Sequence, residues 1–483
     1  GPFQGLAKAT FLEGVIFTYK ALCYQKLYKY AAADSLYLIA IKKYNAVKGD
    51  TADAKIAILY SNLAESMGEQ LQFGYSNLLY TASIVILDRD STSDENKKKI
   101  IGNYHHLIEN HLRADSLEKA LVFIEETFKR VDKATIDYCK TNLYQGLCYY
   151  KLSKYRQADE ILTYCLDCFK KILEPNNQNI AENHLVLAQV EIALAEYQMA
   201  EKNLDKGIEI TTDNFDKNSV RYANYLKLYA HLHKELGSYE KAEKEYEQVL
   251  ETYVEQLGET NSKLPEVLAE LADLEIVLAK FDKAKAYSDS SMSMAKFFID
   301  LDKPSVTTLI NSAAYVNYSI GHYDLSDSLY HKSINISKNY ELQSTAPTAM
   351  ALNGLGLLMT ARGNSKLADS LFLRSLELHI ELFSENHPFT SIVYLNYANL
   401  KIDENKLSQA KEILSKSQEI NKNFFNEGHD IFADIYVAYG DVAKREGQID
   451  KAREFYQKAI VIYLDKFDEG HIRIQSTRQK MKN

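Results

Sequence analysis

The sequence contains no tryptophan and little proline or glycine, with 6 prolines and 19 glycines among 483 residues. So few helix-breaking residues exclude long Pro/Gly-rich linkers, and with them a string of separately linked domains. Hydrophobic residues make up 46% and charged residues 25%, which is near the average of folded domains and excludes general disorder. Tyrosine, by contrast, occurs 35 times. Because tyrosine buries its ring while its hydroxyl reaches water, this usage suits thin layers with much surface.

Long apolar runs and basic blocks are also absent. No run of about eighteen apolar residues occurs, which excludes a transmembrane helix and a membrane partner. The net charge is −9 with no basic block, so we expect no nucleic acid partner. Five cysteines, an odd number without small-domain spacing, favour a reducing compartment, and we expect a cytoplasmic protein. Gly1-Pro2 is typical of the residues that remain after an expression tag is removed. The native start could then have carried a signal peptide, so the periplasm is the alternative location.

One pattern with a 42-residue period dominates the chain. It consists of two series of small residues, twelve positions apart, with an aromatic residue often standing three positions before the second series. The first series is Gly146, Ala188, Ala230, Ala272, Ala314, Gly356, Ala398 and Gly440, and the second is Ala158, Ala200, Ala242, Ala284, Ser326, Ala368, Ala410 and Ala452. A register kept over eight units predicts a structural repeat.

The repeat predicts a helical hairpin. Small residues let two antiparallel helices approach closely, and a glycine or asparagine between them ends the first helix. Such turn residues stand five positions before the second series, at Gly237, Gly321, Gly363, Asn405 and Gly447. Apolar residues recur at three- and four-residue steps, and no strand alternation appears. We therefore predict an all-α fold.

The N-terminal part follows the same pattern less regularly, with Ala33, Ser76 and Ala120 as equivalent small residues. This makes about eleven hairpins. Because one hairpin cannot bury its own apolar face, we predict that neighbours stack into a quasi-one-dimensional, right-handed superhelical solenoid. The expected parts are irregular repeats at 3–135, a regular array at 136–470 and a cap or tail at 471–483. The polar segment 88–99 is the expected flexible loop.

Two segments resemble the second helix of a tetratricopeptide repeat, "GSYEKAEKEYEQVLETY" at 237–253 and "GQIDKAREFYQKAIVIY" at 447–463. The 42-residue period and Asn386-His387-Pro388 between hairpins resemble the kinesin-light-chain type of this repeat, and Gly428-His429 and Gly470-His471 recur at the same phase. The resemblance covers residues 15–470 and implies the fold more than the function. HEAT and armadillo arrays have a similar period and are the alternative fold, but the paired small residues favour the tetratricopeptide repeat.

No sequence signature of catalysis or of a cofactor site is present. His-Glu-x-x-His, a nucleophile elbow, a phosphate loop and a dinucleotide fingerprint are all absent. His387, His429 and His471 are each one repeat period apart, so they would lie in successive layers, too distant to share a metal ion. We expect each of them to bond to nearby backbone, and we expect no enzyme and no cofactor.

Four cysteines fall within one predicted hairpin: Cys139, Cys148, Cys165 and Cys168. Cys139 lies roughly level with Cys168 when the two helices are counted outward from their turn. Zinc would need four converging thiolates, yet Cys148 lies about two and a half helical turns from Cys139. Because cysteine is a common small core residue, we expect unbonded core cysteines, with a redox pair or a metal site as alternatives.

The family resemblance implies that the first helix of each hairpin lines a concave groove. Residues two, three or six positions before the first small residue, and one after it, would face that groove. Asparagine offers a donor and an acceptor together, so it can pair with an extended peptide backbone. The predicted partner-binding residues are Lys227, His231, Asn311, Tyr315, Asn353, Asn396 and Asn399.

These features predict a non-catalytic scaffold that binds a peptide or a partner subunit in its groove. A second hypothesis is the regulatory part of a larger bacterial caspase-like peptidase of the TPR-CHAT type, because "SDSLYHKSI" and "ADSLFLRSL" look like the repeats of such proteins. Peptide-pheromone sensors also use such repeats, but they commonly add a DNA-binding helix-turn-helix. No basic recognition helix is apparent here.

Overall fold

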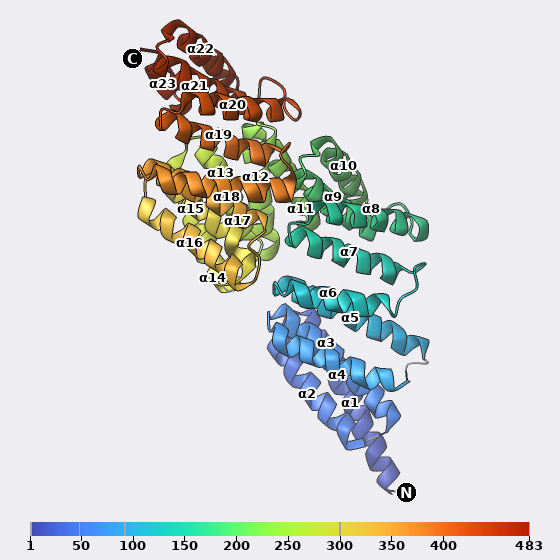
Figure 1. Ribbon diagram of the computed structural model, residues 1–483. Helices are drawn as coiled ribbons and strands as arrows, with labels where there is room; N and C mark the ends of the chain where they lie inside the picture. The colour runs from blue at the N-terminus through green and yellow to red at the C-terminus, as the bar shows by residue number, and fades with distance from the viewer. Residues whose placement is uncertain (1, 48, 91–92, 299–300, 483) are drawn as a thin grey trace. The chain divides into compact units, whose positions relative to one another are not determined.

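The computed structural model describes residues 2–47, 49–90, 93–298 and 301–482, with side chains from residue 6 onward. This part of the chain forms 23 α-helices, two short 3-10 helices and no strand, which confirms the all-α prediction (Figure 1). The chain divides into two compact units, one of residues 1–151 and 164–172 and the other of residues 152–163 and 173–483. We describe each unit by itself.

The first unit contains three hairpins and part of a fourth. Its helices are α1 (Pro2–Lys26), α2 (Tyr30–Val47), α3 (Asp50–Glu69), α4 (Phe73–Leu87), α5 (Asp94–Arg113), α6 (Leu117–Phe128), α7 (Ile136–Lys151) and the end of α8 (Tyr155–Ile172). The prediction of a loop at 88–99 is wrong for most of that segment. Asp88–Asp90 is a 3-10 helix and α5 begins at Asp94, capped by the Ser93 hydroxyl, while residues 91–92 lie outside the described part.

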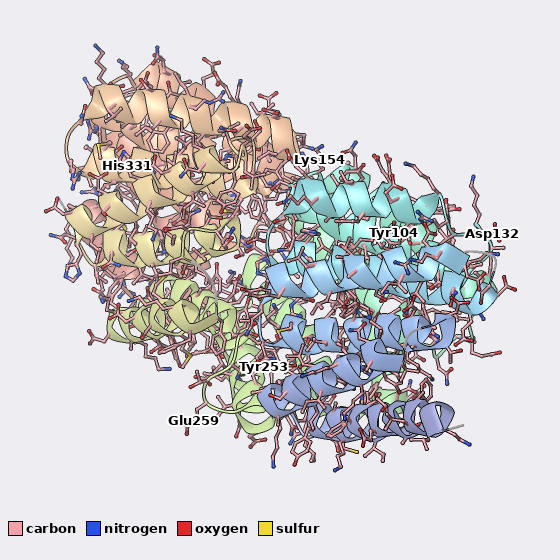
Figure 2. All side chains as sticks on the ribbon, turned by 90° about the horizontal axis from the view of Figure 1, so that it is seen from below. Tyr104, Asp132, Lys154, Tyr253, Glu259 and His331 are labelled. Carbon is pink, nitrogen blue, oxygen red and sulfur yellow. A yellow bond between two sulfur atoms is a disulfide. The ribbon has the colours of Figure 1, made fainter. Side chains whose placement is uncertain are left out.

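The second unit begins with the start of α8 and contains the remaining helices. They are α9 (Gln178–Ala193), α10 (Tyr197–Asn214), α11 (Val220–Glu235), α12 (Tyr239–Leu257), α13 (Leu264–Val277), α14 (Phe281–Phe298), α15 (Thr307–Ser319), α16 (Tyr323–Asn339), α17 (Ala346–Ala361), α18 (Ser365–Phe383), α19 (Pro388–Asp403), α20 (Leu407–Lys422), α21 (Asp430–Arg445), α22 (Ile449–Lys466) and α23 (Ile472–Lys482). Consecutive helices pair from α9–α10 to α21–α22, and α23 packs on α22. Tyr253, labelled in Figure 2, is one of the large side chains that are fully buried in this unit.

The small residues of the repeat lie where the two helices of a hairpin meet. Ala188 and Ala200 are fully buried, as are most of their equivalents. At Gly440 a β-carbon would lie 2.4 Å from the Tyr456 ring, and at Gly356 one would lie 2.6 Å from the Phe372 ring. Any larger residue at these two positions would therefore push the helices apart.

Each of the eleven hairpins turns through one residue with a positive φ. The predicted turn residues Gly237, Gly321, Gly363, Asn405 and Gly447 have this conformation. The other six hairpins use non-glycine residues at the same position: Tyr28, Leu71, Asp115, Ser153, Ala195 and Ala279, with φ between 53° and 61°. A left-handed conformation costs a non-glycine residue roughly 1 kcal/mol, so the hairpin geometry outweighs the local preference.

The second unit also contacts itself between hairpins that are far apart in sequence. The imidazole Nε2 of His429 donates to the carbonyl oxygen of Glu235 at 3.0 Å, and His471 does the same to Val277 at 3.0 Å. Each pair is separated by 194 residues. One buried apolar cluster correspondingly joins α11–α13 to α21–α23. The predicted solenoid of stacked hairpins is confirmed, but hairpins far apart in sequence also touch in this unit, so its contacts are not restricted to neighbouring hairpins.

We call this repeated contact the seam. At three levels a phenylalanine of the later hairpin stacks on a tyrosine of a hairpin much earlier in the chain. The pairs are Tyr155–Phe383, Tyr197–Phe425 and Tyr239–Phe467, with ring centroids 5.4, 5.8 and 5.7 Å apart. Ser153 joins the seam at the first level, where its hydroxyl accepts from the Ala346 backbone N–H at 3.0 Å. The common repeat period keeps the two layers in register.

Candidate partner-binding surface

The first helices of the hairpins lie on the inner side of the stack in the second unit. The first helices of neighbouring hairpins contact one another, as α13, α15 and α17 do, whereas neighbouring second helices have no comparable contacts in the described part of the chain. A stack curves toward the side on which its helices are closest together. The predicted partner-binding residues all belong to first helices, α11, α15, α17 and α19.

The inner face of α11 and α13 carries charges that are paired with each other. Lys227 and Glu266 are 2.8 Å apart, Lys234 lies 2.5 Å from Glu270, and the His231 ring is 3.5 Å from the same carboxylate. Lys227 lowers the pKa of Glu266. Burial opposes the charge on Glu270, but Lys234 and His231 outweigh it and hold its pKa well below the usual value. Lys227 and His231 are therefore each in contact with a carboxylate of α13.

Further along the stack, Asp273 of α13 and Tyr315 of α15 have perturbed pKa values. The Ser312 hydroxyl donates to Asp273 at 2.7 Å, yet burial raises the pKa of this carboxyl to about 6. Tyr315 is half-buried. Burial raises the pKa of its hydroxyl, and the nearby Arg473 opposes that shift. Arg473 belongs to α23, so this helix brings a positive charge within electrostatic range of Tyr315 on α15.

The predicted asparagines have different environments. Asn311 is buried and its Nδ2 donates to the Pro347 carbonyl at 2.8 Å, which joins α15 to α17 inside the stack. Asn353 and Asn396 are half-buried neighbours, with Nδ2 of Asn396 donating to Oδ1 of Asn353 at 3.1 Å. Within the described residues, Nδ2 of Asn353 and Oδ1 of Asn396 form no further hydrogen bond. Asn399 is exposed.

Apolar side chains beside these asparagines were not among the predicted residues. Met350 and Ile392 occupy the same repeat position on α17 and α19, and each is 39% exposed. Both stand six residues before the first small residue of their repeat, which is one of the positions expected to face the groove. The prediction named mainly polar residues and therefore omitted them. These two residues and four neighbours on α17 and α19 have no ionisable side chain, and we call the set the neutral strip. It consists of Met350, Asn353, Leu357, Ile392, Asn396 and Asn399.

The three repeated histidines bond to nearby backbone as expected. Nδ1 of His387, His429 and His471 accepts from the backbone N–H two residues later, at 3.2, 3.2 and 3.3 Å, and so caps the following helix. Their second role in the seam was not predicted. Burial lowers the pKa of His387 to about 3, and the carbonyl of Ala193, at the end of α9, faces its ring and opposes that shift.

The expectation of unbonded core cysteines is wrong for two of the four. Cys139 of α7 and Cys168 of α8 form a disulfide with a Cα–Cα distance of 5.9 Å. Cys148 and Cys165 are buried thiols outside this bond, and burial raises the pKa of Cys148 to about 12. Within the described residues, no group of three His, Cys, Asp or Glu side chains is placed to hold a metal ion.

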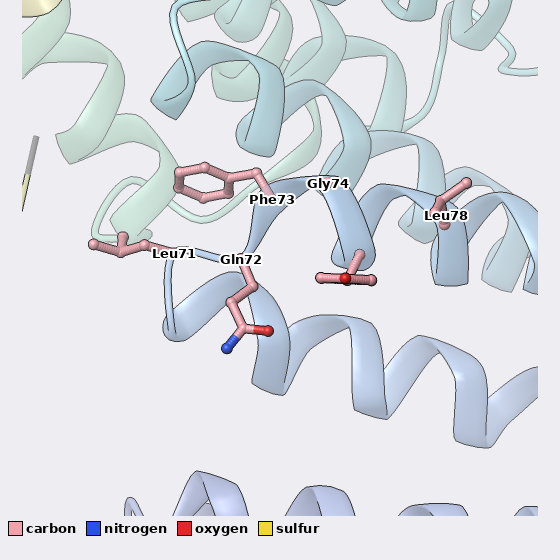
Figure 3. A pocket seen from close by; sticks show the side chains of 6 residues that line it. Leu71, Gln72, Phe73, Gly74 and Leu78 are labelled. Carbon is pink, nitrogen blue, oxygen red and sulfur yellow. The ribbon is translucent and has the colours of Figure 1, made fainter. Parts of the chain in front are cut away.

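One hollow of about 470 Å³ lies in the first unit, at the turn between α3 and α4 (Figure 3). Leu71, Phe73, Tyr75 and Leu78 supply most of its lining, so it offers apolar contact and no acid, base or nucleophile. Among the described helices, none combines the length and the apolar character that crossing a bilayer requires.

Comparison with known proteins supports the repeat. Models of the tetratricopeptide repeat match residues 183–255, 347–423 and 433–465. No curated protein matches the chain. A Rap protein complexed with competence and sporulation factor is similar in structure, with a TM-score of 0.52 and 13% identity, covering 79% of this chain and 98% of that one.

Two other solved structures show weaker similarity. The apo form of RapI has a TM-score of 0.49 and 17% identity, over 59% of this chain and 98% of its own. BtubC (BKLC) from P. vanneervenii has a TM-score of 0.36 and 19% identity, over 50% of this chain and 92% of its own. At 13% sequence identity, the similarity to the Rap complex shows a common fold and nothing about function. The matched repeat models and the eleven hairpins show that the chain is built from repeats of the tetratricopeptide type.

Proposed function

We propose that this protein is a non-catalytic scaffold that binds an extended segment of a partner protein on the neutral strip. The observation that carries this proposal is the Asn353–Asn396 pair, which spans two neighbouring helices and leaves one donor and one acceptor unused. An extended peptide backbone presents the complementary acceptor and donor.

The rest of the strip defines the chemistry of that segment. Met350 and Ile392 expose apolar surface on both sides of the asparagines, so an apolar partner side chain would gain free energy by covering them. A charged side chain would lose hydration without finding a counter-ion on this strip. Where the segment continues toward α15 and α11, it would meet Tyr315 and then the paired charges of Lys227 and His231.

The test uses a photo-crosslinking residue at Leu357, in the neutral strip. The matched control carries the same residue at Leu373, which is 45% exposed on α18, the second helix of the same hairpin. We expect Leu357 to crosslink a partner that Leu373 does not, and the Asn353→Ala/Asn396→Ala variant to weaken its capture at least tenfold. Equal crosslinking at both positions, or capture unchanged by the double variant, would contradict the proposal.

Two further expectations stay predictions. A role beside a caspase-like peptidase would be tested by reading the gene beyond codon 483 for a His/Cys-bearing domain. The cytoplasmic location would be tested by the redox state of the Cys139–Cys168 pair in the cell. A permanent disulfide is typical of an oxidising compartment such as the periplasm.

A further inference from the structure

Three cysteines meet in the hairpin of α7 and α8. Cys139 on α7 is bonded to Cys168 on α8, and the Cys165 thiol, one turn earlier on α8, donates to the Cys139 carbonyl oxygen at 3.0 Å. Cys165 and Cys168 are three residues apart, so both lie on the face of α8 that packs against α7. Cys139 therefore has two cysteines within reach across the same helix–helix contact.

We propose that Cys139, Cys165 and Cys168 form a thiol–disulfide exchange site that locks the α7–α8 hairpin in two alternative ways and is opened by a dithiol reductant. The fourth cysteine of the hairpin, Cys148, takes no part. It lies about two and a half turns from Cys139 on α7 and stays a neutral core thiol.

The exchange between the two locked forms needs no external redox partner. The Cys165 thiolate attacks the Cys139 sulfur, the Cys139–Cys165 bond forms, the Cys139–Cys168 bond breaks, and Cys168 leaves as a thiolate that takes up the proton. Opening uses an external dithiol. Its first thiolate attacks Cys168, its second thiol resolves the mixed disulfide, and the two electrons and two protons pass to Cys139 and Cys168 while the reagent becomes a disulfide.

Burial determines the order of these steps. Cys139 and Cys165 are fully buried, whereas Cys168 retains 8% of its surface. An external reagent therefore reaches the site through Cys168, and Cys165 is shielded from reagents while it remains next to Cys139. Cys168 therefore keeps a small accessible surface for an incoming reagent, while the exchanging Cys165 has none, as in a site with a resolving thiol.

Both bonded cysteines belong to the first unit. Helix α8 contributes residues 164–172 to the first unit and its preceding residues to the second. The bond closes a loop of 29 residues, so reducing it should increase the opening of the hairpin roughly four-hundredfold by the chain-entropy relation.

The first experiment maps the disulfides of the purified full chain by mass spectrometry without reduction. Trypsin releases Cys139 in residues 134–140 and both α8 cysteines in residues 157–170. Cleavage before Asp167 then separates Cys165 from Cys168. After incubation at pH 8 with a catalytic amount of dithiothreitol and an acid quench, we expect Cys139–Cys165 beside Cys139–Cys168. Wild type that yields Cys139–Cys168 alone would overturn the exchange.

Two variants test the same point in oxidised glutathione. Cys168→Ser should form Cys139–Cys165, and Cys165→Ser should form Cys139–Cys168, while Cys148→Ser is the matched control and should behave as wild type. A Cys168→Ser protein with helical circular dichroism and free thiols at both remaining positions would contradict the proposal. Hydrogen exchange in 136–172 should rise on reduction of wild type and stay unchanged in Cys139→Ser. Equal exchange in reduced and oxidised wild type would overturn the proposed locking.

Discussion

The imidazole of His429 connects two helix ends through one ring, with Nε2 on the Glu235 carbonyl at the end of α11 and Nδ1 on the Ile431 N–H at the start of α21. Helix ends carry backbone groups that have no partner within the helix. The neutral ring satisfies one at each end. This requires the proton on Nε2, so the seam depends on the neutral form of the histidine.

Replacing His429 should test the energy of the seam. We expect His429→Ala to lower the free energy of unfolding of the second unit by about 2 kcal/mol, because it removes a cap and a buried hydrogen bond. His429→Asn retains a capping side chain and should lose about 1 kcal/mol. Urea unfolding followed by circular dichroism measures both.

The matched control for His429 is Ser219→Ala. Ser219 caps α11 by accepting from the Tyr222 N–H through its hydroxyl, which is a bond within its own hairpin and not across the seam. The variant should lose only the cap, about 1 kcal/mol. If Ser219→Ala and His429→Ala were equally destabilising, the seam bond would contribute nothing measurable.

Acid should weaken the seam at His387, whose pKa is lowered to about 3 by burial. The unfolded chain binds a proton near pH 6.5, while the folded chain resists it until about pH 3. Stability contributed by the neutral ring is therefore complete above pH 6.5 and is lost as the pH falls toward 3. The stability advantage of wild type over His387→Asn should shrink between pH 7 and pH 4. A pH-independent difference would contradict the assignment.

Glu191 should show the opposite pH dependence. It is buried in α9, its two carboxylate oxygens accept from Asn203 Nδ2 at 2.8 Å, and burial nevertheless raises its pKa to about 7. The folded chain holds this proton more tightly than the unfolded chain, so stability is lost as the pH rises from 4.5 to 7. Glu191→Gln should therefore be more stable than wild type at pH 8, by about 2 kcal/mol, and gain little at pH 5. Thermal unfolding at both values measures the difference.

Two glycines offer a matched test of helix contact. Gly440→Ala should destabilise the second unit by about 2 kcal/mol, because its β-carbon would meet the Tyr456 ring at 2.4 Å. Gly102, within α5, has no atom within 4 Å of an added β-carbon. Gly102→Ala should stabilise its helix by about 0.5 kcal/mol. Equal effects of the two substitutions in thermal unfolding would show that close approach is not what the small residue provides.

The sequence by itself determined the local repeat of this protein. The paired small residues predicted where helices meet, and Gly237, Gly321, Gly363, Asn405 and Gly447 predicted five of the eleven turns. These features depend on contacts within a single repeat, so they leave a periodic trace. The other six turns left no such trace, because the hairpin imposes positive φ on residues that are neither glycine nor asparagine.

For the candidate site, the repeat brings Asn353 and Asn396 within hydrogen-bond distance, because they stand at adjacent positions of successive repeats, three residues before Gly356 and two before Ala398. It did not reveal that Asn311 is turned into the stack or that Met350 and Ile392 flank the pair, because exposure depends on how neighbouring hairpins cover each position. The seam was decided by tertiary structure alone. Glu235 and His429 meet because the curvature of the stacked hairpins brings residues 194 positions apart together, and that curvature is a sum of small packing angles that no single residue encodes.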